Sequence, residues 1–316
     1  MQTRTLGANG PELTEVGLGT WAIGGPWTYG WGPQDDEDSI RAIRAALEAG
    51  VNWIDTAPAY GLGHSEEVVG RAVEGREVLL ATKCGITWDD RGNVDRGNIR
   101  PDSLRREIDA SLRRLKTDCV DLYQIHWPDP HGRTPVEDAW QELVRIRDAG
   151  KARYIGVSNF SVDELRCCQA IAPVQSVQPP YNLLQRGVEE ELLPFCREQG
   201  IGVVAYGPMH NGLLTGNFHE KTLAPDDHRR GKPAFEEPQL SRNLRFVERI
   251  RPLAEREGKS VANLAVAWVL RHPAVTSAIV GARNERQAKD NARAAGWRLT
   301  EAQLQTISDA LAAEDL

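Results

Sequence analysis

The feature that most constrains the fold of this 316-residue chain is its alternation of short apolar runs with amphipathic segments. The apolar runs have the length of strands. The segments between them repeat apolar residues at helical spacing, as Ile40, Ile43 and Leu47 do. Candidate strands lie at residues 16–18, 53–55, 78–83, 120–126, 154–157, 176–178, 202–206 and 277–280. Eight strands that alternate with helices over this length predict a (β/α)8 barrel of the TIM type.

Helix boundary signals agree with this pattern. Ser161 and Glu164 have capping-box spacing, and so do Thr134 and Glu137, with Pro135 at the first helical position. A glycine that precedes a candidate strand predicts a left-handed helix C-cap. This is the case at Gly50, Gly150 and Gly200.

The segments outside the alternation have separate interpretations. Residues 4–16 predict an N-terminal β-hairpin, with a turn at residues 9–11, that plugs one end of the barrel. Loops of unusual length at residues 85–100 and 207–241 indicate functional segments. No linker or composition shift divides the chain, so we expect a single domain over residues 1–316. A doubly wound sheet is the rival fold, but it would need a GxGxxG turn after an early strand, and none occurs.

Charge and cysteine content limit the partners and the compartment. The net charge of −7 argues against nucleic acid as a partner. No apolar run approaches the ~20 residues that cross a bilayer, and no apolar targeting segment follows Met1. Five cysteines without CxxC spacing indicate thiols in a reducing compartment. We therefore expect a cytoplasmic protein that acts on a small molecule.

Polar residues end three successive candidate strands. Asp55 ends the second strand and Tyr60 follows five residues later, while Lys83 ends the third strand and His126 the fourth. In a barrel these ends meet at the mouth, where barrel enzymes carry out chemistry. Taken singly, each residue has an ordinary structural interpretation as a loop cap, a packing residue, a solvated charge or a core histidine. Together they predict one shared site.

The expected chemistry follows from the residue types. Tyrosine has a pKa near 10 and is a poor acid at neutral pH, but Lys83 beside it should stabilise the phenolate and lower that pKa. Asp55 should keep Lys83 charged, and His126 should orient a substrate oxygen. This is a tuned general acid that faces a carbonyl, with no metal-ligand pattern.

Motifs along nearly the whole chain resemble those of the aldo-keto reductase family. They are Gly-Thr-Trp at residues 19–21, Asp-Thr-Ala-Pro-Ala-Tyr-Gly at 55–61, Lys83, Gln-Ile-His-Trp at 124–127, Gly-Val-Ser-Asn-Phe at 156–160, Gln178 with Tyr181 and Asn182, Gly-Leu-Leu-Thr-Gly at 212–216, and Gly-Ala-Arg-Asn at 281–284. The resemblance implies NADPH-dependent carbonyl reduction on a barrel. It also implies that Asp55, Tyr60, Lys83 and His126 form a catalytic tetrad in which Tyr60 donates the proton.

The segment after the last strand predicts a phosphate site. Asn284 can cap the helix that follows, and Arg283, Gln287 and Asn291 recur every fourth residue on one face. These side chains, after Gly281, suit a 2′-phosphate and an adenine, and a guanidinium favours NADP over NAD. The alternative is an ordinary polar helix face.

The resemblance also implies cofactor contacts elsewhere. Ser158, Asn159 and Gln178 match positions that bind the nicotinamide carboxamide, and Tyr206 matches the ring that stacks on it; their other interpretation is strand-end caps and core packing. Further contacts are expected from Gly19, Thr20, Trp21, Gly207, Pro208, Met209, Gly212 and Leu213. Relatives often differ at residues 209–211 and carry a basic residue in place of Asn217, which weakens the predicted pyrophosphate contact.

Trp21, Trp88 and Trp127 are the candidate walls of an apolar substrate pocket. The first hypothesis is a monomeric or weakly oligomeric reductase of aldehydes, ketones or sugars. Two alternatives stay open: a redox-sensing NADP-binding regulatory subunit, and a sugar dehydrogenase that works in the oxidative direction. A metal-dependent hydrolase that uses Asp55 and His126 as ligands is disfavoured by Lys83 and Arg283.

Overall fold

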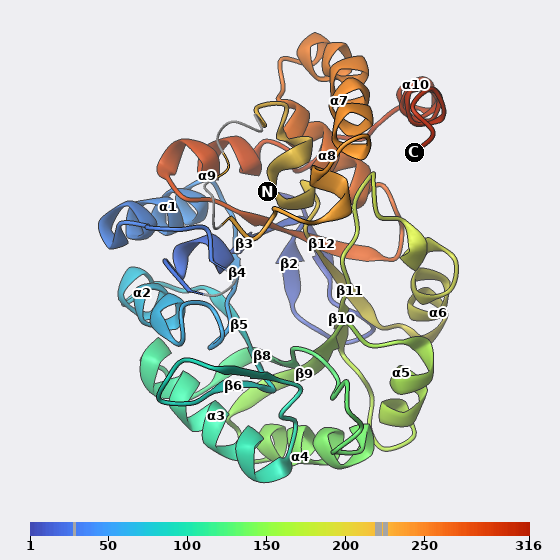
Figure 1. The fold of residues 1–316 in the computed structure, drawn as a ribbon. Helices are drawn as coiled ribbons and strands as arrows, with labels where there is room; N and C mark the ends of the chain where they lie inside the picture. The colour runs from blue at the N-terminus through green and yellow to red at the C-terminus, as the bar shows by residue number, and fades with distance from the viewer. Residues whose placement is uncertain (28–29, 219–222, 224–226) are drawn as a thin grey trace.

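A computed structural model describes residues 1–27, 30–218, 223 and 227–316 of the chain. Within these residues, eight parallel strands close into a barrel in the order β10-β11-β12-β3-β4-β5-β8-β9 (Figure 1). Their bounds are β3 Val16–Gly19, β4 Trp53–Asp55, β5 Leu79–Cys84, β8 Val120–Ile125, β9 Ala152–Ser158, β10 Ser176–Gln178, β11 Gly202–Tyr206 and β12 Val275–Gly281. The predicted (β/α)8 barrel is confirmed, and each expected strand is present within three residues of its predicted ends.

Helices surround the barrel, as the alternating pattern predicts (Figure 1). The helices of this outer layer are α1 Asp36–Glu48, α2 His64–Ala72, α3 Pro101–Leu115, α4 Val136–Asp148, α5 Val162–Gln169, α6 Leu192–Gln199, α8 Val261–Leu270 and α9 Glu285–Ala292. The long helix α7 Gln239–Arg256 precedes α8, and α10 Glu301–Ala312 packs beside α7.

The helix boundaries confirm most of the sequence signals. Ser161 and Glu164 form a reciprocal capping box at α5. Gly50, Gly150 and Gly200 all have positive φ, between 65° and 93°, the left-handed conformation that favours glycine. The capping box expected at Thr134 is wrong, because Pro135 precedes the helix at the N-cap position and no side chain caps α4.

Strand register brings the predicted site residues to one rim. Gly281 pairs with Gly19, and Gly19 with Asp55, so three neighbouring strands end at the same level. Lys83 pairs with Gln124, and Gln178 with Ser158, at the corresponding ends of their strands. Parallel pairing therefore places the carboxyl ends, and the loops that follow them, around one opening.

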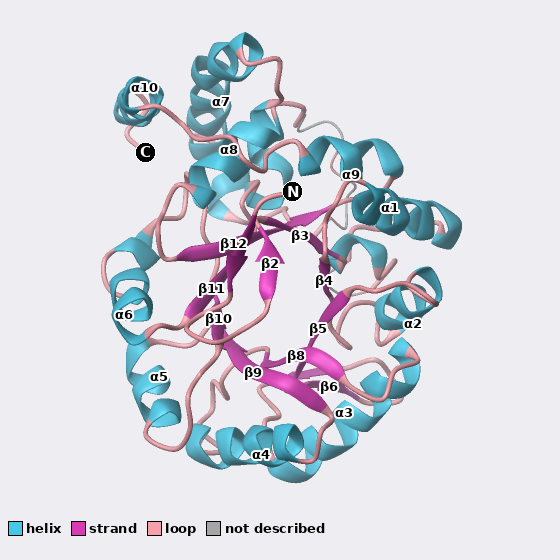
Figure 2. Cartoon of the chain, turned by 180° about the vertical axis from the view of Figure 1, so that it is seen from behind, coloured by secondary structure: helices cyan, strands magenta, loops and turns pink. Residues whose placement is uncertain are grey.

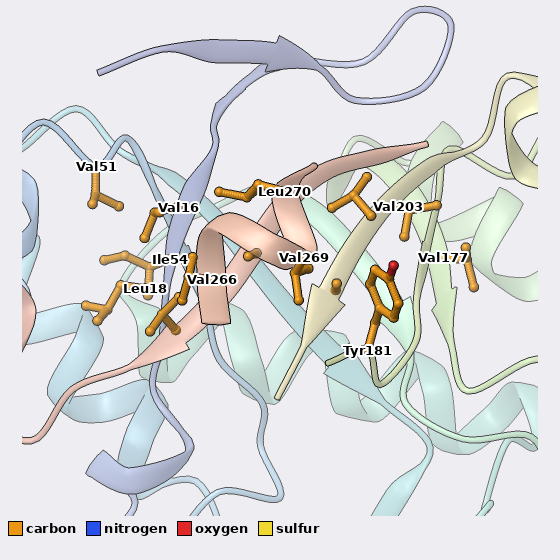
Figure 3. Packing of buried hydrophobic residues seen from close by; sticks show 14 of the residues in the cluster. Val16, Leu18, Val51, Ile54, Val177, Tyr181, Val203, Val266, Val269 and Leu270 are labelled. Carbon is orange, nitrogen blue, oxygen red and sulfur yellow. The ribbon is translucent and has the colours of Figure 1, made fainter. Parts of the chain in front are cut away.

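The larger hydrophobic core lies between the barrel and its helices. Figure 3 shows Val266, Val269 and Leu270 of α8 among strand residues that include Val16, Leu18 and Val203. Every residue of α8 is buried, which explains why this helix is apolar on all sides rather than amphipathic.

A second cluster fills the barrel interior. It contains Trp53, Leu122 and Val204 from the strands, with Leu6 and Leu13 from the N-terminal hairpin. The hairpin strands β1 Thr3–Thr5 and β2 Glu12–Thr14 pair antiparallel and lie across the end of the barrel opposite the rim (Figure 2). The predicted hairpin is confirmed, and its apolar side chains close the barrel floor.

The two long loops carry structure that the strand pattern did not predict. Residues 85–100 contain a hairpin of β6 Ile86–Trp88 and β7 Val94–Arg96. Residues 207–241 contain the 3-10 helices η3 His210–Thr215 and η5 Pro233–Phe235, and the start of α7. Residues 219–222 and 224–226 of that loop lie outside the described residues. Two further 3-10 helices are η1 Trp21–Ile23 and η2 Gly187–Glu189.

Glu15 joins the hairpin to the segment that precedes α10. Its fully buried carboxylate pairs with Arg4 at 2.7 Å and accepts a hydrogen bond from the Gly296 amide at 2.9 Å, and Arg298 also contacts it. Burial alone would raise the pKa of Glu15, but the contacts from Arg298, Gly296 and Arg4 outweigh it, so the pKa is lowered.

We expect Glu15→Gln to lower the free energy of unfolding by about 2 kcal/mol at pH 7, because it removes a charge that two guanidinium groups share. A folded-state pKa below the ordinary value means that this contribution is complete above about pH 4.3 and disappears as the pH falls through the folded-state pKa. Urea unfolding of both proteins between pH 7 and pH 3 should show the difference shrinking with acid. A difference that grows with acid would contradict this account.

Candidate active site

One cavity of about 1190 Å³ opens at the rim formed by the carboxyl ends of the strands. Strand ends, the β6–β7 hairpin and the loop after β11 line it. Asp55, Tyr60 and His126 are among its lining residues, and Lys83 lies directly beneath them with its side chain fully buried.

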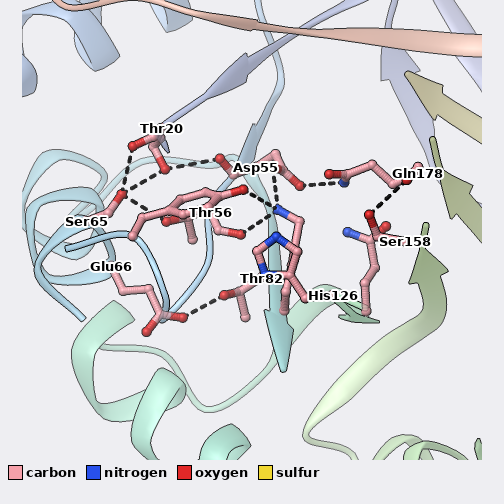
Figure 4. A network of polar contacts seen from close by, with 12 residues as sticks. Thr20, Asp55, Thr56, Ser65, Glu66, Thr82, His126, Ser158 and Gln178 are labelled. Atoms are coloured by element: carbon pink, nitrogen blue, oxygen red, sulfur yellow. Dashed lines mark hydrogen bonds and ion pairs between the residues drawn. The ribbon is translucent and has the colours of Figure 1, made fainter. Parts of the chain in front are cut away.

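Figure 4 shows the polar network around Asp55, Thr56 and Gln178, and the hydrogen bonds of Lys83 join it. Its Nζ donates to Asp55 Oδ1 at 2.6 Å, to the Thr56 carbonyl at 2.9 Å and to Tyr60 Oη at 3.2 Å. An ammonium has three donors and no acceptor, so these contacts use all its hydrogens. Burial lowers the pKa of Lys83, while the charge of Asp55 and its hydrogen bond oppose that change.

Asp55 is held from both sides. Its second oxygen, Oδ2, accepts from Gln178 Nε2 at 2.9 Å, and the Gln178 carbonyl accepts from Ser158 Oγ at 2.8 Å. Its backbone carbonyl accepts from both the amide and the hydroxyl of Thr20. Residues from β4, β5, β9 and β10 thus fix one carboxylate in place, and it can neutralise Lys83 without reaching solvent.

Tyr60 lies in the loop after β4 with its hydroxyl on Lys83. Because Lys83 can only donate, the Tyr60 oxygen accepts, and its own hydrogen is directed elsewhere. Burial, followed by the charge of Asp55, raises the pKa of Tyr60 well above 10. The expectation that Lys83 would lower this pKa is wrong for this structure, because Asp55 neutralises Lys83 and burial dominates. The phenol is therefore protonated at neutral pH.

His126 stands beside Tyr60, with the two rings 5.7 Å apart and nearly perpendicular. Burial, together with the charges of Lys83 and Arg96, lowers its pKa well below 6.5, so the imidazole is neutral. Its Nδ1 is buried and has no hydrogen-bond partner within the described residues. Because the neutral ring also lines the cavity beside Tyr60, it can hydrogen-bond to an oxygen placed next to the Tyr60 hydroxyl.

A second polar group, Asn159, lies next to His126 on the cavity wall. Asn159 has a φ of 62°, unusual for a residue other than glycine, and its amide nitrogen donates to the His126 carbonyl and to Ser158 Oγ, both at 3.0 Å. Its Oδ1 accepts from the Tyr206 hydroxyl at 2.9 Å. Asn159 therefore ties the tetrad wall to the Tyr206 ring, and both line the cavity.

The turn after β11 presents backbone to the cavity. Gly207, Pro208, Met209 and Gly212 line it, and Gly207 and Gly212 have φ values of 65° and 90°. Leu213 does not line the cavity. Its side chain is fully buried in a cluster with Phe235 and Leu240, so the structure does not bring this predicted contact to the site.

The far end of the cavity is formed by Gly281 and the start of α9. Asn284 caps this helix by accepting from the Gln287 amide at 3.0 Å, as predicted. Arg283 donates to Gln34 Oε1 at 2.7 Å and to the Pro33 carbonyl at 2.6 Å, and Asn291 donates to the Gly281 carbonyl at 3.0 Å. Arg283, Gln287 and Asn291 all line the cavity, on the shared face that their spacing predicted.

Two of the three tryptophans predicted to form the substrate pocket line the cavity, and one does not. Trp21 and Trp127 line the cavity, together with Gly19 and Thr20. Trp88, at the end of β6, pairs with Val94 of β7 and does not line it. Sequence reasoning missed Trp31, Arg96, His228, Arg229 and Lys232, which do line it. Four of these five belong to the two long loops, so loop length was the available signal.

Other properties bear on the open alternatives. Within the described ranges, no three His, Cys, Asp or Glu side chains gather as metal ligands. All five cysteines are free. Among the described helices, none combines the length and the apolar character that a membrane span requires.

The sequence pattern of the family described as "Aldo/keto reductase family" matches residues 15–312. Aldo-keto reductase YhdN of Bacillus subtilis (strain 168) is 42% identical over 305 residues, which cover 95% of this chain and 90% of the relative. The NADH-specific methylglyoxal reductase of Escherichia coli (strain K12) is 35% identical over 314 residues, 96% of each chain.

Solved structures agree. The glycerol dehydrogenase AKR11B4 of Gluconobacter oxydans has a TM-score of 0.89 and 41% identity, covering 99% of this chain and 95% of its own. An aldo/keto reductase of Klebsiella pneumoniae in complex with NADP and acetate has a TM-score of 0.75 and 27% identity, covering 98% of this chain and 95% of its own. With the tetrad geometry at the barrel rim, these matches show that the chain belongs to the aldo/keto reductase family of oxidoreductases.

Proposed function

We propose that this enzyme reduces aldehydes, ketones or sugar carbonyls to alcohols with NADPH, and that Tyr60 donates the proton. The hydrogen bond from Lys83 to Tyr60 Oη carries the proposal. It leaves the phenolic hydrogen free to meet a substrate oxygen, and it places a cation against the phenolate that proton donation would create.

The residues around the cavity fit NADP(H). The Tyr206 ring offers a flat surface for nicotinamide, and Ser158, Asn159 and Gln178 place polar groups beside it. The glycine-rich turn after β11 exposes backbone to a pyrophosphate, and the capped N-terminus of α9 with Arg283 suits a terminal phosphate. When bound, NADPH supplies the hydride that reaches the carbonyl carbon.

The chain's own groups act on the carbonyl oxygen. The neutral His126 ring and the Tyr60 hydroxyl can both hydrogen-bond to it, which orients the carbonyl. Tyr60 then transfers its proton to the oxygen as negative charge develops there. Lys83 stabilises the resulting phenolate, and Asp55, held by Gln178, keeps Lys83 charged. The raised pKa of Tyr60 ensures that the acid is protonated before each turnover.

Cofactor preference is assigned to Arg283. Its guanidinium lies at the far end of the cavity and is steadied by Gln34 and Pro33. A bidentate guanidinium favours a phosphate over a hydroxyl. The Klebsiella pneumoniae relative was solved with NADP, whereas the Escherichia coli relative is named as NADH-specific, so the preference is open to test within this family.

A second candidate is oxidation of a polyol or sugar, because the Gluconobacter oxydans relative is named as a glycerol dehydrogenase. In the oxidative direction the Tyr60 phenolate would act as the base, so we expect this direction to need a pH that deprotonates the buried phenol. The five free cysteines support a reducing compartment, such as the cytoplasm, as the place where the enzyme works.

The regulatory-subunit alternative would be favoured if NADPH binds but no carbonyl compound oxidises it.

Tyr60→Phe should lower kcat for carbonyl reduction by roughly 10²–10⁴-fold, because it removes the proton donor while keeping the ring. The dissociation constant for NADPH, measured by fluorescence titration, should stay within a few-fold of the wild-type value. Tyr154→Phe, on β9 outside the cavity, is the matched control and should keep full turnover. Unchanged turnover in Tyr60→Phe would refute the assigned role.

Asp55→Asn and Lys83→Met should each destabilise the protein, by about 3–5 kcal/mol, since each leaves one buried charge without its partner. The double variant should lose less than the sum of the two, because it removes both charges. Urea unfolding of the three variants measures this coupling. Additive losses would mean that the pair is not coupled in the folded protein.

Arg283→Ala should raise KM for NADPH about 10-fold or more while leaving KM for NADH nearly unchanged, since only NADPH carries the 2′-phosphate. Lys289→Ala removes a cation from α9, the helix that follows Arg283, outside the cavity and should change neither constant. An equal rise in both KM values would assign Arg283 to a part shared by the two cofactors.

A further inference from the structure

The carboxyl group of Glu107, on α3, lies where the β6–β7 hairpin leaves the barrel. Its Oε2 accepts a hydrogen bond from the Gly85 amide at 2.8 Å, and its Oε1 accepts one from Ser103 Oγ, one turn earlier on α3, at 2.9 Å. Gly85 directly follows β5, the strand that ends with Lys83 and Cys84. Glu107 therefore bonds to the backbone two residues beyond the lysine of the tetrad.

Gly85 is the base of the hairpin. Its φ is 88°, and a Cβ at this position would come within 2.9 Å of the Ile99 side chain, so the sharp exit from β5 needs glycine. Its carbonyl accepts from the Gly97 amide at 2.8 Å, which closes the hairpin, and its amide donates to Glu107. A side chain of α3 thus supplies the acceptor for a backbone amide that turns away from the barrel.

The hairpin forms the cavity wall next to the tetrad. Ile86, Val94 and Arg96 of the hairpin line the cavity. The Arg96 guanidinium lies over the Trp127 ring at 5.6 Å, and Trp127 directly follows the tetrad residue His126. The proposed phosphate end of the cavity is lined by the start of α9 instead. The position of the hairpin therefore affects the space beside the tetrad and leaves the phosphate end unchanged.

Glu107 can change its charge near neutral pH. Burial of the carboxyl group raises its pKa to about 7, although the hydrogen bonds from Gly85 and Ser103 oppose that change. The other titratable or charged groups that face it come from four elements: Arg106 of α3, Glu66 of α2, Cys84 of β5 and Tyr123 of β8. The arginine opposes the shift and the second glutamate adds to it. The thiol and the phenol stay neutral, because burial raises their pKa values well above the ordinary range.

The negative charge of Glu107 is not what stabilises the fold. A folded-state pKa above the ordinary value of about 4.3 means that ionisation costs stability, and this cost develops as the pH rises from about 4 to about 7. A neutral glutamine oxygen could accept from the Gly85 amide without that cost. An ionised carboxylate accepts a stronger hydrogen bond from an amide than a neutral group does. The charge therefore adds a firmer hold on the hairpin, at the expense of stability.

We propose that Glu107 is a positioning residue whose carboxylate fixes the β6–β7 hairpin at its exit from β5 and so sets the cavity wall that faces the substrate. Ionisation tightens the hairpin and strengthens substrate binding, and protonation loosens it. Lys83 keeps its three hydrogen bonds in both states, so the chemical step changes little. This inference rests on the proposed carbonyl reduction and adds a residue outside the cavity that controls substrate affinity.

The first test measures kcat and KM for methylglyoxal, which has no titratable group, at saturating NADPH between about pH 6 and pH 8.5. The wild-type KM should rise about 3- to 10-fold as the pH falls through 7, since the charge-assisted hydrogen bond is lost. Glu107→Gln should show the acid value of KM at every pH, with kcat within about two-fold of wild type. The cavity histidines titrate below this range, because burial lowers the pKa of His210 and His228 to about 4 and that of His126 well below 6.5.

The second test needs no turnover. Hydrogen exchange of residues 85–97, measured by mass spectrometry at pH 8, should be faster in Glu107→Gln than in wild type. Urea unfolding at pH 8 should show that this variant is no less stable than wild type, because it removes a buried charge. The matched control is Asp109→Asn on the same helix. Asp109 pairs with Lys151, so the control should keep the wild-type exchange and the wild-type KM profile.

A wild-type KM profile in Glu107→Gln, or unchanged exchange in the hairpin, would overturn the inference. A parallel loss of kcat, NADPH affinity and stability would also overturn it, because Glu107 would then support the whole barrel. If wild-type enzyme oxidises NADPH with neither methylglyoxal nor propanal, the proposed function fails, and its substrate-binding consequence fails with it. Faster exchange in Glu107→Gln would still support the hold of Glu107 on the hairpin in that case, which separates the two failures.

Discussion

The site depends on a single buried ammonium that has three acceptors. Lys83 has no exposed surface, and an unpaired charge at that depth would destabilise the fold by several kcal/mol. Asp55, Thr56 and Tyr60 satisfy its three hydrogens, and Gln178 satisfies the second oxygen of Asp55. Each group therefore constrains the next, and the Tyr60 hydroxyl has one orientation left for its own hydrogen. The stability of the buried charge and the proposed chemistry therefore depend on the same contacts.

The barrel makes this arrangement possible because parallel strands end together. The tetrad and its supports come from β4, β5, β8, β9 and β10, which are distant in sequence but neighbours around the rim. The hairpin fills the opposite end with Leu6 and Leu13, so the interior is packed there and the cavity opens at the side of the site. Rigid strand ends carry the groups that we propose react, and the long loops carry other residues that line the cavity, such as Arg96 and His228.

Much of the fold and of the tetrad could be predicted because both leave local signals. Apolar runs and helical periodicity identified the strands, and glycines at Gly50, Gly150 and Gly200 marked helix ends. The buried position of Leu213 and the pKa of Tyr60 had non-local causes, whereas the difference at Thr134 had a local one. Leu213 lies in a motif, but packing against Phe235 turns it away from the cavity. Thr134 had a capping pattern, but Pro135 occupies the cap position. The pKa of Tyr60 rises because burial, which no spacing reveals, outweighs the nearby cation.

By itself the sequence determined the barrel, its hairpin plug and the family, because strand length, helical period and motif order are properties of neighbouring residues. Only the tertiary structure decided which charges neutralise one another, which side chains reach the cavity and which polar atoms lack partners. His228 illustrates the difference. In the sequence it is one histidine in a long polar loop, whereas in the structure its ring packs against Trp21 and Trp31, from a distant segment, at the cavity wall. Burial and electrostatics sum over the whole fold, so no local pattern contains them.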